Sequence, residues 1–85
     1  MINVREMVEA YEREGEHIVI CVDGQAIIGR IDSVDDDDES GLGEIGISMF
    51  TPEGAYVGIG QSEIERIDPM TDEMRATYTE LYRAH

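Results

Sequence analysis

The chain has 85 residues, enough for one domain with a single modest hydrophobic core. Twenty acidic residues stand against six basic residues, all of them arginine, and the formal net charge is −14. A field this negative repels phosphate backbones and anionic lipid headgroups, so the composition argues against nucleic-acid binding and against docking on a membrane surface.

The hydropathy and the cysteine content indicate a cytoplasmic protein. No apolar run approaches the roughly 20 residues that cross a bilayer, and charges occur throughout residues 1–16, where a signal peptide needs an apolar segment. Cys21 is the only cysteine, which excludes an internal disulfide. The lysine-free, carboxylate-rich surface resembles that of proteins from salt-loving organisms; alternatively, it is itself a face that binds a basic partner.

Residues 3–14 are predicted to form an amphipathic helix. Their apolar residues follow the spacing of one helix face, i, i+3, i+4 and i+7: Val4, Met7, Val8 and Tyr11. Asn3 is a suitable N-cap, and Gly15 supplies the left-handed residue that often follows a helix.

Residues 17–68 are predicted to form five strands of a small barrel. The β-branched run from His17 to Val22 is the first strand, and Asp23-Gly24 predicts a two-residue type I′ turn after it. The second strand runs from Gln25 to about Val34, with a sharp bend expected at Gly29.

The remaining predicted elements follow in chain order. The third strand covers Glu44–Phe50, and Thr51–Gly54 forms a turn. The fourth strand contains Tyr56, Val57 and Ile59, and a short fifth strand passes through Ile64 and Ile67. Pro69 precedes a second helix over 70–84, whose apolar residues form one stripe: Met70, Met74, Tyr78, Leu81 and Tyr82.

This order of elements resembles the Sm-like family of small barrels over residues 3–68. Residues 18–35 (IVICVDGQAIIGRIDSVD) contain the family's apolar strand, a turn glycine, a second glycine five residues on and a closing aspartate. Gly60, followed by Ile64 and Ile67, is similar to the family's second motif. The resemblance implies a mainly β fold with flanking helices, and self-assembly through the fourth and fifth strands, so a homo-oligomer is expected.

Two departures from the family pattern disfavour RNA binding. Family members that bind RNA have an asparagine where this chain has Glu39 and an arginine where it has Ile59. Gly60 to Ile64 is also one residue longer than usual. A carboxylate and an aliphatic side chain replace groups that would contact a base.

Residues 36–41 fit the D-x-D-x-S-G start of a calcium loop. Asp36, Asp38 and Ser40 are the candidate ligands, and Glu44 at the ninth position could add another oxygen. The twelfth position is Ile47, where the EF-hand loop needs a bidentate glutamate, so the alternative interpretation is a solvated loop between two strands.

No arrangement of residues predicts catalysis or a bound cofactor. His17 is interpreted as a strand-start residue and Cys21 as a small core residue, and His85 is distant in sequence. We therefore expect a non-enzymatic assembly or protein-binding module. Its expected interface residues are Tyr56, Val57, Ile59, Met74, Tyr78, Leu81 and Tyr82. The alternatives are an acidic nucleic-acid mimic that occupies a basic DNA-binding protein, and an Sm-like RNA-binding protein.

Overall fold

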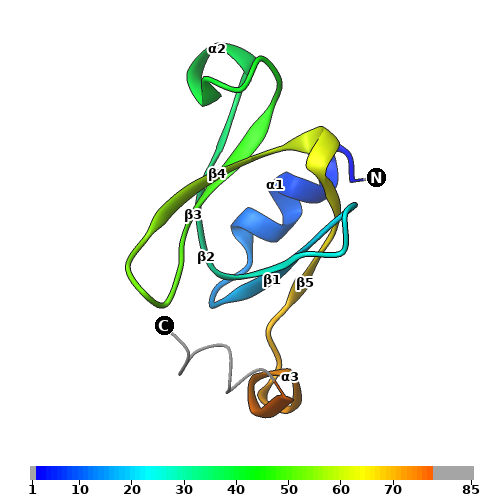
Figure 1. Ribbon diagram of the computed structural model, residues 1–85, viewed down its shortest axis with the longest axis vertical. Coiled ribbons are helices and arrows are strands. Elements are labelled where there is room, and N and C mark those ends of the chain that lie inside the picture. Colours follow the sequence, from blue (N-terminus) through cyan, green and yellow to red (C-terminus); the bar gives the residue numbers. More distant parts are fainter. Residues whose placement is uncertain (1, 78–85) are drawn as a thin grey trace.

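The computed structural model describes residues 2–77, which form a mainly β protein with an N-terminal helix (Figure 1). Its elements are α1 (Val4–Glu12), β1 (His17–Cys21), β2 (Ala26–Asp35), α2 (Asp37–Ser40), β3 (Gly46–Phe50), β4 (Tyr56–Gly60), the 3-10 turn η1 (Gln61–Glu63), β5 (Ile64–Pro69) and α3 (Asp72–Thr77). No helix within these residues has the length and apolar character needed to cross a bilayer.

The five strands form one antiparallel sheet in the order β4-β3-β2-β1-β5. β4 and β5 are its two edges and are not paired with each other in the part of the chain that the structure describes. The strands therefore form an open, strongly curved sheet and not the predicted barrel, because hydrogen bonds between β4 and β5 do not close it. The five predicted strands and the mainly β class are confirmed.

The predicted bend at Gly29 is confirmed and divides β2 into two pairing segments. The residues before the bend pair with β1, whereas those from Arg30 onward pair with β3. A Cβ atom on Gly29 would lie 2.9 Å from the carbonyl carbon of Phe50 and would clash still more closely with the carbonyl oxygen. Glycine thus lets β3 approach the bend closely enough to pair.

The predicted type I′ turn at Asp23-Gly24 is wrong. The loop has three residues, with the Cys21 N–H donating to the Gln25 carbonyl at 2.8 Å and the Gly24 N–H donating to the Cys21 carbonyl at 3.0 Å. Gly24 has a φ of +93°, but Asp23 does not have the positive φ that a type I′ turn requires. A three-residue loop needs only one residue with positive φ, here Gly24, because that residue forms a bulge at the start of the next strand.

α1 confirms the predicted helix but presents a different face to the sheet. Asn3 caps it, since its side chain accepts the Glu6 N–H at 2.9 Å. Met7 and Ala10 are buried, whereas Val8 and Tyr11, predicted on the buried face, are 37% and 44% exposed. α1 contacts β2 and β5, and its buried residues are Met7 and Ala10, so the predicted apolar stripe lies only partly on the buried face.

In Figure 1, α1 lies within the curve of the sheet. One hydrophobic cluster connects the helix to the strands. Its buried members come from the N-terminal segment and all five strands: Ile2, Met7, Ala10, Val19, Cys21, Ile31, Ile47, Met49, Ile59, Ile64 and Ile67. Within the helix predicted over 70–84, the structure describes α3. Tyr78, Leu81 and Tyr82 lie outside the described residues, and so does the side chain of Met74.

Candidate functional site

The edge strand β4 directs only one of its predicted interface side chains outward. Ile59 is 4% exposed and belongs to the core, and Val57 packs against the same cluster. Tyr56 is 55% exposed. Any contact along this edge would therefore use the backbone of β4 rather than the side chains of Val57 and Ile59.

The hydrogen-bond pattern of the β3–β4 hairpin shows which backbone groups face outward. At the turn, the Thr51 N–H donates to the Ala55 carbonyl at 2.9 Å. Bonded and non-bonded pairs alternate along an antiparallel ladder, and the β3–β4 register has no irregularity. The N–H and C=O groups of Tyr56 and Gly58 therefore point away from β3, toward the uncovered side.

Two carboxylates cover the far end of this edge. Glu63 accepts the outward N–H of Gly60 at 3.1 Å. Glu44 accepts the Ser62 N–H at 2.6 Å and the Ser62 hydroxyl at 2.7 Å. These two bonds from Ser62 lower the pKa of Glu44 below its ordinary value of 4.5. Within residues 2–77, the uncovered stretch of the β4 edge is thus limited to Tyr56–Gly58.

An aromatic pair lies on the outer face of the sheet beside this edge. Phe50 and Tyr56 are cross-strand partners, with ring centroids 4.7 Å apart and ring planes tilted by 54°. Phe50 is 47% exposed, and the Tyr56 hydroxyl donates to the Asp32 carboxylate at 3.1 Å. Arg30 is the partner of Phe50 on β2. Phe50 was not among the predicted site residues, although its position directly before the Thr51–Gly54 turn was a usable signal.

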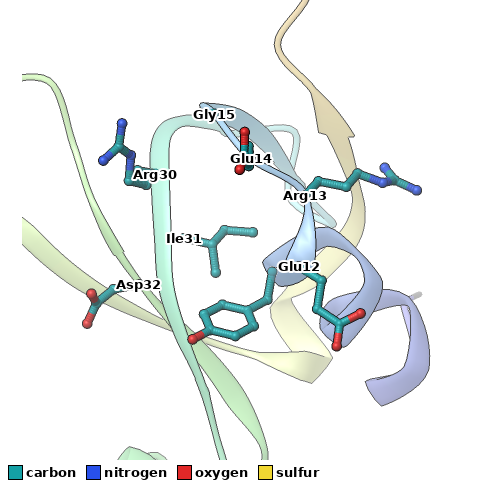
Figure 2. Close-up of a pocket in the computed structure, with 8 residues that line it drawn as sticks. Glu12, Arg13, Glu14, Gly15, Arg30, Ile31 and Asp32 are labelled. Atoms are coloured by element: carbon teal, nitrogen blue, oxygen red, sulfur yellow. The ribbon is translucent and has the colours of Figure 1, made fainter.

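Two shallow hollows flank Arg30. The larger, of about 610 Å³, separates the end of α1 from β2 (Figure 2) and is lined by Tyr11, Glu12, Arg13, Glu14, Gly15, Arg30, Ile31 and Asp32. Figure 2 shows Ile31 pointing to its middle, while the guanidinium groups of Arg13 and Arg30 point apart. The smaller, of about 380 Å³, is lined by Glu16, Gly29, Arg30, Phe50, Thr51 and Pro52. The described residues that line the two hollows include no histidine and no cysteine.

The structure separates the predicted calcium ligands into two groups. Asp36 and Asp38 lie together with Asp37, their ligand atoms within 4.8 Å of one another, and all three are exposed. Asp36 also caps α2 by accepting the Asp38 N–H at 3.1 Å. The Ser40 hydroxyl instead donates to the Glu44 carbonyl at 2.7 Å, and the Glu44 carboxylate is bonded to η1. Calcium binding stays a prediction.

His17 and Cys21 are buried, as expected of a strand-start and a core residue. His17 is 1% exposed, and neither ring nitrogen has a hydrogen-bond partner within residues 2–77. Burial lowers the pKa of His17, with the charge of Arg13 acting in the same direction and the Gly15 carbonyl opposing it. Burial, followed by the charge of Asp23, raises the pKa of the Cys21 thiol. In both residues, burial favours the neutral form of the side chain.

The structure also places the two residues that depart from the Sm-like pattern in the sequence. Glu39 is exposed on α2, and Ile59 faces the core. Comparisons with protein-family models, curated proteins and solved structures find no match for this chain. The features that bear on function are therefore the β4 edge and the outer face of the sheet.

Proposed function

We propose that this chain is a non-enzymatic assembly module of Sm-like architecture that pairs its uncovered β4 edge with an edge strand of a second copy. The observation that carries the proposal is the outward-facing backbone of Tyr56–Gly58. Unpaired strand edges form hydrogen bonds with other chains unless lysine, proline or a covering segment blocks them, and β4 contains no lysine or proline.

The sheet topology supports the Sm-like part of the proposal. β4 and β5 are the two edges, β2 bends at Gly29, and η1 joins the edge strands through a tight corner. The Ile2 N–H donates to the Ile64 carbonyl at 3.1 Å, which places the N-terminal segment beside the start of β5. Assembly would then pair β4 of one copy with the part of the β5 edge in the next copy that follows Ile64.

The charge of each subunit opposes assembly. At −14 per chain, copies repel one another at low ionic strength. The Debye length falls from about 10 Å at 0.1 M salt to about 3 Å at 1 M, so association should strengthen with added salt. Sedimentation velocity at high protein concentration in 0.1 M and 1 M KCl tests this directly.

A single position on β4 allows a matched pair of variants. A Cβ atom at Gly58 would meet only Leu42 Cδ1 at 3.9 Å and the Ile47 carbonyl oxygen at 4.0 Å, which are ordinary contacts. Gly58→Lys adds a charge beside the edge and should give monomers, whereas Gly58→Ala should assemble like the wild type. A wild-type chain that stays monomeric at 1 M KCl would refute the proposal.

The C-terminal residues predicted at the interface need a separate variant. Deletion of residues 70–85 removes Met74, Tyr78, Leu81 and Tyr82 and leaves the five strands complete. Loss of assembly in this variant, with assembly retained in Gly58→Lys, would move the interface from β4 to the C-terminal segment. Displacement of DNA from a basic DNA-binding protein by a monomeric wild type would instead support the mimic hypothesis.

A further inference from the structure

The only phenylalanine of the chain is on the surface. Phe50 and its partner Tyr56 are both about half exposed, although the core beneath them accepts aliphatic side chains from every strand. Burying a phenylalanine side chain stabilises a protein, so an exposed aromatic pair forgoes part of that stabilisation. A surface role for the pair would account for its position.

The chemistry around the pair is suited to a positive charge. Aromatic ring faces carry negative potential, and the tilted arrangement is not a face-to-face stack that would bury both rings. The Tyr56 hydroxyl bonds to Asp32, which holds a carboxylate at the rim of the pair. Phe50 also borders the smaller hollow, whose lining includes the ring of Pro52 and the carboxylate-bearing Glu16.

Among the residues that the structure describes, Arg30 is the cation beside the aromatic pair. Arg30 faces Phe50 across the β2–β3 ladder and lines both hollows. Within residues 2–77, Arg30 forms no ion pair and no cation–π contact with Phe50. An incoming cation would therefore meet exposed rings, and within residues 2–77 Arg30 is the group beside them that repels it.

We infer that the outer-face surface formed by Phe50, Tyr56, Asp32 and the smaller hollow docks an arginine or lysine side chain from an extended segment of another protein. The net charge of −14 attracts cationic segments and repels nucleic acid. The ring faces select the cation by a cation–π contact. This surface shares Tyr56 with the β4 edge, but it uses the Tyr56 side chain, whereas assembly uses backbone groups of β4, so the inference does not depend on self-assembly.

The direct test uses the full-length chain and a nine-residue peptide of alternating arginine and glycine. Because the chain has one phenylalanine, selective labelling of that residue type gives a single set of ring signals for NMR. In 0.15 M KCl, the arginine peptide should shift the Phe50 ring signals, and a glutamate–glycine peptide of the same length should not. Unchanged Phe50 signals at saturation with the arginine peptide would overturn the inference.

Variants separate the specific site from general attraction to an acidic protein. Phe50→Leu keeps an apolar side chain without the ring and should weaken peptide binding by at least about threefold, measured by fluorescence anisotropy of labelled peptide. Arg30→Gln should tighten peptide binding. Val22→Ala alters an exposed apolar residue on the β1–β2 loop and is the matched control. Equal affinity of Phe50→Leu and the control variant would mean diffuse attraction and refute the site.

The same titrations distinguish this inference from the assembly proposal. A wild-type chain that sediments as a monomer refutes assembly, yet its Phe50 signals still report on peptide binding. A Phe50 response to a uridine oligonucleotide without one to the arginine peptide would overturn the inference in favour of nucleic-acid stacking.

Discussion

Replacing Gly29 with alanine should destabilise the fold far more than the same replacement at another strand glycine. The added Cβ would be forced into the Phe50 carbonyl and would lie 3.1 Å from Met49 Cε. Overpacking costs typically 1–3 kcal/mol, and the upper end applies because the obstacle is backbone in a paired strand. We expect a loss of about 3 kcal/mol, from a total of roughly 4–13 kcal/mol for a domain of this size.

The assay is urea or thermal unfolding of Gly29→Ala beside Gly58→Ala. Both variants change the unfolded chain in the same way, so the difference between them isolates the clash in the folded state. Alanine at position 58 meets only ordinary contacts and should change the free energy of unfolding by less than about 0.5 kcal/mol. Gly29→Ala should lower the Tm by about 12–24 °C. Equal stabilities would refute the close approach of β3 to the bend.

Further predictions concern pH and salt. Burial lowers the pKa of His17 in the folded state, so the unfolded chain binds a proton there more readily. The free energy of unfolding should therefore fall as the pH drops below about 6.5. In urea unfolding, His17→Gln should lack this part of the pH dependence. The lowered pKa of Glu44 contributes stability above pH 4.5 that is lost as the pH falls further, so Glu44→Gln should flatten the dependence between pH 5 and 3. The wild-type Tm should rise between 0.1 M and 1 M KCl because screening reduces repulsion among the excess negative charges; a constant Tm would contradict that reasoning.

The strands and their order along the chain were predictable because their signals are local. The turn at Thr51–Gly54 is confirmed by the Gly54 N–H bond to the Thr51 carbonyl at 2.9 Å, with a φ of +86° at Gly54. Gly29 marked the bend because only a residue without a side chain permits such close pairing. The detailed type of the Asp23-Gly24 turn was not predictable, since two- and three-residue loops share the same Asp-Gly signal.

Features that depend on distant parts of the chain were predicted less well. The buried face of α1 is decided by how the helix lies on β2 and β5, and Val8 and Tyr11 are therefore more exposed than their spacing indicated. Glu44 was a candidate calcium ligand from its place in a local motif. Its carboxylate instead bonds to Ser62, 18 residues later, through a contact that no local pattern encodes.

The place where β1 begins is also the place where β5 ends. His17 pairs with Pro69, and just outside them the Met70 N–H donates to the Glu16 carbonyl at 3.0 Å. A pulling force applied through the segments before β1 and after β5 would therefore load the bonds between these strands one after another instead of all together. Such a geometry yields at low force, so tension should peel β5 from β1 first while β2, β3 and β4 remain joined.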